Sequence, residues 1–353
     1  MRRKYFRKLL RRFMVGKRYR PSEEERQEVL DLVKDNYHPS ALEKIAPPIE
    51  AAETRPDEQR SPEDYLVLAT DAYRTGEHEQ ALEYAFAGLH LHPGDDRVAS
   101  SLRNRLGTVF KVLGVKSLAV RNFDRALGLD PNCHGPLYNL GMVYFEQGKF
   151  EDAEKKLQEA IRFDPPNPDY HNDLGKVYLT QKLYDEAEEA FREAIRLNGS
   201  KVAYRINLAL THYDRQQFGK AREQVIEAIE QNPSQPLPHM IFGNICFKQR
   251  RYKEAEAAYR EALKLDSGST TIYNLLGDLY FEQKQYGPAE TEYQRAAGLQ
   301  PNNAKAHKNL GRVYLAQERF AEAEAELKKS IRLDPAAAAG LINFKITPPK
   351  KKA

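Results

Sequence analysis

Seven blocks of 34 residues follow one another from Ser100 to Ala337 without an insertion or deletion, which restricts the chain to folds that stack one repeated unit. One column of the aligned blocks holds only alanine: Ala119, Ala153, Ala187, Ala221, Ala255, Ala289 and Ala323. Two further columns hold small residues: Gly107, Gly141, Gly175, Ala209, Gly243, Gly277 and Gly311, and Ala126, Ala160, Ala194, Ala228, Ala262, Ala296 and Ser330. Small residues at fixed positions predict that two helices approach closely there.

Each block has the pattern of two helices. In the block from Gly141 to Pro165, apolar residues recur at helical spacing, stop at Gly148 and resume with Phe150. A late column carries proline: Pro131, Pro165, Pro233, Pro301 and Pro335. Proline lacks an amide proton and clashes with the preceding turn, so it ends a helix. The pattern predicts helix, tight turn, helix and stop.

These columns resemble those of the tetratricopeptide repeat family, over residues 62–337. A looser eighth copy occupies residues 62–95, and four extra residues, Asp96 to Ala99, separate it from the seven contiguous repeats of 100–337. The resemblance implies an all-α, right-handed solenoid of about eight helix-turn-helix repeats. The tryptophan column of the family is absent and here reads Arg103, Leu137, His171, Arg205, His239, Tyr273 and His307.

The composition agrees with such a fold. The 353 residues are 30% charged, and no apolar run approaches the roughly 18 residues that a membrane span needs. A solenoid tolerates this polarity because each repeat buries surface only against its neighbours. The two cysteines, Cys133 and Cys246, lie too far apart in the repeats to form a disulfide, which suits a reducing, cytoplasmic compartment.

Charge is distributed unevenly along the chain. The net charge is +4, yet residues 1–20 carry ten Lys or Arg and no acidic residue. Removing these and the four lysines after residue 344 leaves −10 for residues 21–344. The repeats are therefore acidic overall and both ends are basic.

The N-terminal segment 1–20 is predicted to form a basic amphipathic helix. Its candidate docking residues are Arg2, Arg3, Lys4, Tyr5, Phe6, Arg7, Lys8, Leu9, Leu10, Arg11, Arg12 and Phe13. On a helix the apolar and basic residues separate onto opposite halves, a pattern typical of helices that lie on an anionic membrane surface. We therefore expect peripheral attachment at the inner face of a bacterial membrane.

Other interpretations of this segment stay open. It could bind RNA, with Arg and Lys on phosphates and aromatic rings on bases, which would suit an RNA- or ribosome-associated adaptor. It could dock in a groove of a partner protein or of another copy of the chain. A cleaved mitochondrial presequence fits less well because residues 1–21 contain no serine. A plain solvated basic tail leaves the segregation of the two faces unexplained.

The segments that flank the repeats are predicted to be short. Residues 21–46 should be helical, beginning at a capping box of Ser22 and Glu25. Residues 47–61 are acidic and rich in proline, which predicts a flexible linker. Residues 338–353 should form an abbreviated cap and a basic tail; alternatively, the end of the solenoid stays open and receives a partner or a second protomer.

The resemblance implies that the first helix of each repeat lines a concave groove for a protein partner. We call its three lines of residues the first-helix rows. The first row is Asn104, Tyr138, Asn172, Ile206, Met240, Asn274 and Lys308; the second is Thr108, Met142, Lys176, Leu210, Asn244, Asp278 and Arg312; the third is Lys111, Phe145, Leu179, Tyr213, Phe247, Phe281 and Leu315. From these rows the predicted contact residues are Tyr138, Met142, Phe145, Asn172, Leu179, Ile206, Leu210, Tyr213, Met240, Asn244, Phe247, Asn274 and Phe281. The aromatic residues of the third row could instead pack on a neighbouring helix.

A variant of the family binds acidic C-terminal peptides through Lys and Asn residues on three consecutive first helices. Asn139, Asn207 and Asn309 fall in one of its columns. Asp173, Ile241 and Leu275 interrupt that column and the matching lysines are missing, so we do not predict chaperone-tail binding.

Nothing in the sequence predicts catalysis. Phosphate-loop, zinc-protease, paired-cysteine and nucleophile-elbow motifs are absent, and we expect no cofactor. His171, His239 and His307 share one repeat column but stand two repeats apart, too far to share a metal ion. The sequence therefore predicts a non-enzymatic interaction scaffold or assembly factor, or alternatively a subunit that recruits substrates to an enzyme complex.

Overall fold

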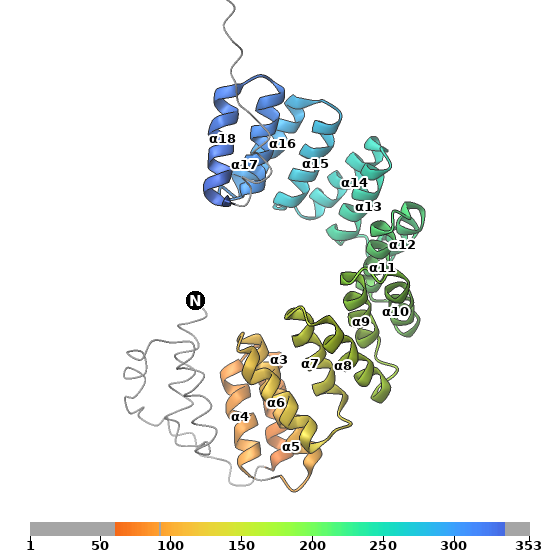
Figure 1. Cartoon of the computed structure of the whole chain (residues 1–353), viewed down its shortest axis with the longest axis vertical. Helices are drawn as coiled ribbons and strands as arrows, with labels where there is room; N and C mark the ends of the chain where they lie inside the picture. Colours follow the sequence, from red (N-terminus) through yellow and green to blue (C-terminus); the bar gives the residue numbers. More distant parts are fainter. Residues whose placement is uncertain (1–60, 92, 336–353) are drawn as a thin grey trace, which may run out of the picture. The chain divides into compact units, whose positions relative to one another are not determined.

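The computed structural model describes residues 61–91 and 93–335, and the regular elements in these ranges are α-helices, with no strand among them (Figure 1). The chain divides into two compact units, residues 1–182 and 183–353. Within each unit the predicted all-α repeat fold is confirmed. Segments 1–20 and 21–46, most of the linker 47–61, the docking residues Arg2 to Phe13 and the cap 338–353 lie outside the described residues.

The first described helix of the first unit is capped. The described helices of this unit are α3 (Pro62–Arg74), α4 (His78–His90), α5 (Asp96–Val112), α6 (Lys116–Leu129), α7 (His134–Glu146), α8 (Phe150–Phe163) and α9 (Pro168–Thr180). Ser61 and Asp64 form a capping box at α3, in which the amide of Asp64 donates to Ser61 Oγ at 3.3 Å and the amide of Ser61 donates to Asp64 Oδ2 at 2.9 Å. The four extra residues 96–99 lengthen α5 to 17 residues.

The second unit continues the same alternation. Its helices within residues 183–335 are α10 (Tyr184–Leu197), α11 (Val202–Asp214), α12 (Phe218–Gln231), α13 (Pro236–Lys248), α14 (Tyr252–Leu265), α15 (Thr270–Glu282), α16 (Tyr286–Leu299), α17 (Ala304–Ala316) and α18 (Phe320–Leu333). In both units each helix packs on the next one along the chain. In the first unit the first helices of successive repeats also touch: α3 with α5, α5 with α7 and α7 with α9.

The small columns lie where the two helices of a repeat cross. A Cβ atom added at Gly243 would lie 2.4 Å from the ring of Tyr259, so only glycine fits opposite that ring. In the repeat that has Ala209 at this position, the facing residue is the smaller Val225, and both are buried. The smaller glycine therefore faces the larger tyrosine, and the larger alanine faces the smaller valine.

The turn between the two helices of a repeat uses one backbone conformation. One residue has φ between 60° and 82° in each described repeat: Gly76, Gly114, Gly148, Lys182, Gln216, Arg250, Lys284 and Glu318. The amides at and after this residue close the helix by bonding back to it; that of Lys284 donates to the carbonyl of Phe281 and that of Gln285 to the carbonyl of Tyr280, both at 2.9 Å. Left-handed φ values cost a residue with a Cβ atom about 1–2 kcal/mol. In the last five repeats the turn residue is not glycine, so each of them carries this steric cost.

We expect Lys284→Gly to stabilise the chain by about 1 kcal/mol, because glycine adopts φ near 60° without a steric penalty. The matched control is Lys329→Gly, at an exposed position inside α18, which should destabilise the chain by about 1 kcal/mol. Urea denaturation followed by circular dichroism measures both, and a loss of stability in Lys284→Gly would contradict this interpretation of the turn.

Candidate functional site

The predicted contact residues lie on first helices in both units. In the first unit they are Tyr138, Met142 and Phe145 on α7, and Asn172 and Leu179 on α9. In the second unit they are Ile206, Leu210 and Tyr213 on α11, Met240, Asn244 and Phe247 on α13, and Asn274 and Phe281 on α15. Asn172, Ile206 and Asn274 are buried and the others are half-buried. The structure thus places them as two sets, one in each unit.

The aromatic residues of the third row pack against the start of the next helix. Four pairs recur with ring centroids 5.6–6.1 Å apart: Phe145 with Phe150, Tyr213 with Phe218, Phe247 with Tyr252, and Phe281 with Tyr286. This contact brings the end of the first helix against the second helix of the same repeat. Part of each ring therefore serves the fold, and only the remaining part is free for a partner.

A polar contact connects successive first helices in the first unit. Asn139 on α7 donates to Asn104 Oδ1 at 3.0 Å and to Thr108 Oγ1 at 3.4 Å on α5. One repeat later, the hydroxyl of Tyr138 donates to Asp173 Oδ2 at 2.7 Å. Asn139 and Asp173 come from the column in which the sequence showed scattered asparagines, so these two members of the column serve contacts between repeats.

Asp173 is buried and accepts several hydrogen bonds. Its side chain is 6% exposed and also accepts from Asn172 at 2.9 Å and from Lys176 Nζ at 2.7 Å. Burial, together with the charge of Asp173, raises the pKa of the Tyr138 hydroxyl well above its usual range. Tyr138 therefore remains a neutral donor to this carboxylate.

The same column is apolar in the middle of the second unit. Ile241 lies in one core cluster with Ile206, and Leu275 packs against the cluster that Met240 also contacts. At the end of the column, the amide of Asn309 lies 3.4 Å from Asn274 Oδ1. In this column α13 and α15 therefore carry the apolar residues Ile241 and Leu275, where α7 and α9 carry Asn139 and Asp173.

Two acceptors in the rows are already occupied by tyrosines of second helices. The hydroxyl of Tyr259 donates to Asn244 at 2.8 Å, and that of Tyr293 donates to Asp278 at 2.6 Å. Burial and the nearby carboxylate of Asp278 raise the pKa of Tyr293. Both bonds fix the rings that lie opposite the glycine column.

Three histidines, in the column where the family has tryptophan, contact the backbone. In each case Nε2 lies 2.9–3.0 Å from the carbonyl oxygen of the proline six residues earlier: His171 with Pro165, His239 with Pro233, and His307 with Pro301. Nδ1 of His307 also lies 2.5 Å from Glu326 Oε2. The two ring nitrogens of His307 therefore hold the loop before α17 and a side chain of α18.

A second set of polar contacts joins the second helices α8, α14 and α16 to the next repeat. Tyr280 on α15 donates to Glu256 at 2.6 Å and accepts from Arg260 at 2.8 Å, both on α14. Burial and the bond to Glu256 raise the pKa of Tyr280 to about 12. Sequence reasoning missed this contact, although an acidic residue followed by a polar residue four positions later is visible on these helices.

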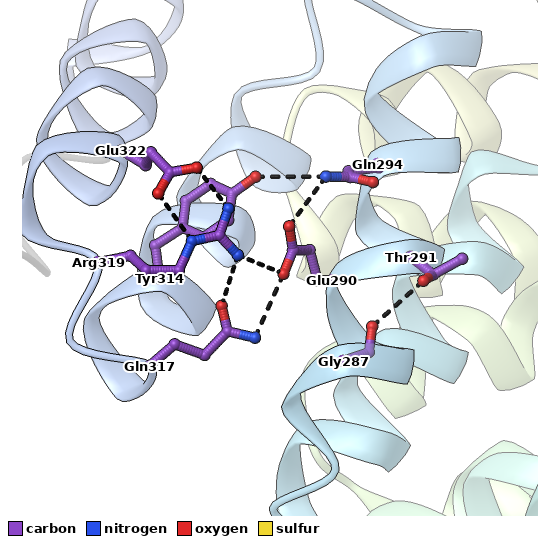
Figure 2. A network of polar contacts seen from close by, with 8 residues as sticks. All are labelled: Gly287, Glu290, Thr291, Gln294, Tyr314, Gln317, Arg319 and Glu322. Carbon is purple, nitrogen blue, oxygen red and sulfur yellow. Dashed lines mark hydrogen bonds and ion pairs between the residues drawn. The ribbon is translucent and has the colours of Figure 1, made fainter.

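Figure 2 shows the equivalent contact at α16, α17 and α18, where it extends into a network. Gln294 on α16 bonds Tyr314 on α17 at 3.3 Å and Glu290 at 3.1 Å. Arg319 lies 4.2 Å from the Tyr314 ring centroid, donates to Glu290 at 2.7 Å and to Glu322 at 2.7 Å. The bonds from Arg319 lower the pKa of Glu322. The network fixes the last described repeat on the one before it.

Within the part of the chain that the structure describes, no three His, Cys, Asp or Glu side chains gather closely enough to hold a metal ion. None of the helices described is both long and apolar enough to cross a membrane.

Comparison with known families identifies the repeats. A sequence model of the tetratricopeptide repeat matches residues 104–168, 138–202, 206–270 and 274–338, which together make up more than half of the chain. A second model of the same repeat matches residues 247–297.

Relatives of this chain share the repeat but little else in sequence. The chain is 27% identical over 118 residues to the photosystem I assembly protein Ycf3 of Prochlorococcus marinus (strain NATL2A), a match that spans 33% of this chain and 66% of the relative, just under two thirds of its length. Among solved structures, a tetratricopeptide repeat protein from Parabacteroides merdae superimposes with a TM-score of 0.56 at 18% identity, covering 72% of this chain and 98% of the other. The Cut9–Hcn1 hetero-tetramer of APC/C gives 0.52 at 17% identity, covering 78% and 54%. Both structural likenesses concern the fold.

Proposed function

Because the chain belongs to the tetratricopeptide repeat family, we propose that it is a non-enzymatic scaffold that binds a protein partner through its first-helix rows. One observation carries this proposal. In the second unit, Leu210 on α11 and Met240 on α13 are half-buried apolar residues of the rows, each packed only in part against a core cluster. Apolar side chains left partly exposed on successive first helices suit contact with another protein.

The partner is proposed to be a component of a larger protein assembly. This part of the proposal comes from the relative whose name describes it as an assembly protein for photosystem I. The 27% identity over a third of this chain supports a similar role as an assembly factor. It does not support assembly of the same complex.

We expect Leu210→Gln with Met240→Gln to reduce partner capture about tenfold, because a polar group at a contact centre must be desolvated without gaining a partner. Leu265→Gln is the matched control, since Leu265 is 38% exposed at the end of α14 and lies outside the rows. Affinity capture from an extract of the source cells, with quantitative mass spectrometry, compares the variants. If the control lost as much partner capture as the row variant, or if the row variant lost none, the first-helix rows would not be the binding surface.

Residues 1–20 are proposed to attach this scaffold to an anionic membrane surface at the inner face of the membrane. Each of the ten basic residues contributes about 1 kcal/mol near such a surface, and salt screening removes that contribution. We expect the full-length chain to float with anionic vesicles but not with neutral ones, and a chain lacking residues 1–20 to float with neither. Flotation that excess RNA abolishes would assign the segment to nucleic acid instead.

A further inference from the structure

The loop between α10 and α11 differs from the equivalent loops of the other repeats. Asn198 follows the last residue of α10 and precedes Gly199, in the column where Asn232 precedes Pro233. Within the described residues, neither the carbonyl of Asn198 nor the amide of Gly199 makes a hydrogen bond. The peptide group between these two residues is therefore held at neither end. Five equivalent carbonyls each accept from the amide three residues later, at 2.9–3.4 Å: those of Asp130, Asp164, Asn232, Asp266 and Gln300.

The side chain of Asn198 is exposed but is held in one orientation. Its Oδ1 atom accepts from the amide of Ser200 at 3.2 Å and from the Ser200 hydroxyl at 2.7 Å. Hydrogen bonds to a carbonyl oxygen draw electron density from its carbon, which makes Cγ a better target for a nucleophile. The two donors also stabilise the negative charge that an attack on Cγ places on the oxygen.

Rotation of one peptide group brings a nucleophile to this carbon. With ψ of 86° at Asn198, the nitrogen of Gly199 lies on the far side of the Cα–C bond from the side chain. Turning the planar peptide group over changes ψ of residue 198 and φ of residue 199 together and leaves the neighbouring Cα atoms in place. Glycine accepts the new φ because it has no Cβ atom, and no hydrogen bond of this peptide group is lost. The bond from Gln231 Nε2 to the Gly199 carbonyl, at 2.9 Å, also remains.

We propose that Asn198 is a site of spontaneous deamidation. The deprotonated backbone nitrogen of Gly199 attacks Cγ of Asn198, the bond from Cγ to Nδ2 breaks, and Nδ2 leaves as ammonia with the proton that Gly199 lost. A five-membered succinimide ring remains. Water then opens the ring: attack on Cγ gives aspartate, and attack on the backbone carbonyl carbon gives isoaspartate, in which the chain continues through the side chain. One asparagine and one water thus become one acidic residue and one ammonia.

The two products affect the repeat differently. Aspartate keeps the loop, because Asp130 and Asp266 stand in the same column and their Oδ1 atoms accept from the amide two residues later at 3.2 Å. Isoaspartate adds one carbon atom to the backbone between α10 and α11. Because α11 carries Ile206, Leu210 and Tyr213, we expect this change to loosen part of the first-helix rows.

The test follows the full-length chain by peptide mass spectrometry during incubation at neutral and at mildly alkaline pH. We expect the peptide that contains Asn198 to gain about 1 Da, faster at the higher pH because the attacking amide must lose its proton. An isoaspartyl methyltransferase should label the product. The peptide that contains Asn232 is the internal control and should not change, since Pro233 has no amide proton.

Three variants test the mechanism. Gly199→Ala should slow the conversion about tenfold, because a residue with a Cβ atom disfavours the turned peptide group. It should fold normally, since the added Cβ atom would lie 3.4 Å from the carbonyl oxygen of Ile195, an ordinary contact. Ser200→Ala should slow the conversion about threefold by removing one donor to Oδ1. Pro233→Gly should make Asn232 a second site.

Three outcomes would overturn the proposal. Conversion in the urea-unfolded chain but not in the folded chain would mean that the fold protects Asn198. An unchanged rate in Gly199→Ala would exclude the rotation of the peptide group from the reaction. A glycan on Asn198 in the chain from source cells would make the sequence Asn198-Gly199-Ser200 a glycosylation acceptor instead.

Discussion

Gly277→Ala is expected to destabilise the second unit by about 2 kcal/mol, the typical cost of forcing a group into a packed core. A Cβ atom at this position would lie 2.4 Å from Cε1 of Tyr293. The ring is fully buried, and its hydroxyl donates to Asp278 at 2.6 Å, so it has no room to turn away. Urea denaturation followed by circular dichroism measures the change.

Two further variants separate the steric effect from helix propensity. Gly298→Ala, in the last turn of α16 with nothing within 4 Å, should be neutral or stabilising by up to about 1 kcal/mol. Gly277→Ala combined with Tyr293→Val reproduces the pair Ala209 and Val225, and it should cost less than the sum of its single substitutions. Additive losses would mean that the close approach does not explain the glycine column.

Asp173→Leu is expected to cost about 3 kcal/mol in the first unit, because it leaves the hydroxyl of Tyr138 half-buried without its acceptor at 2.7 Å. Lys176 loses its ion pair in the same substitution, but its side chain is 41% exposed and water replaces the partner. The same denaturation experiment measures the loss.

The second unit supplies the compensating change. Met240 and Leu275 occupy the columns of Tyr138 and Asp173, and both pack on one apolar cluster. Tyr138→Met with Asp173→Leu should therefore recover at least half of the stability that Asp173→Leu loses. A double variant no more stable than the single one would show that the two kinds of contact are not interchangeable in this fold.

The repeat fold could be predicted because its signals are local. A fixed period, small residues where helices cross, and prolines after the second helices all lie in the sequence itself, and the helices begin and end accordingly. The conformation of the turn was harder to predict. A glycine such as Gly148 indicates a left-handed residue in the sequence, but Lys182 and Glu318 adopt the same conformation without being glycine.

The surface of the first helices could be predicted only in part. The rows were found from the family pattern, but what each residue contacts depends on side chains about 35 positions away. Asn139 falls in a peptide-binding column of the family pattern, and its side chain bonds α5. Phe145 looked like a peptide contact and also packs on Phe150, only five residues later. One missed signal was local: proline followed six residues later by histidine marks the backbone contact of His171 and its equivalents.

The central claim, that a protein partner lies on the first-helix rows, is tested most directly by photo-cross-linking. A benzophenone amino acid is placed at Leu210 or Met240 in the rows, and at Leu265 or Lys253 on α14 as exposed controls. After irradiation in source cells, we predict one shared adduct from the two row positions and none of that mass from the controls. An adduct that forms equally at all four positions, or only at Leu265 and Lys253, would contradict the account.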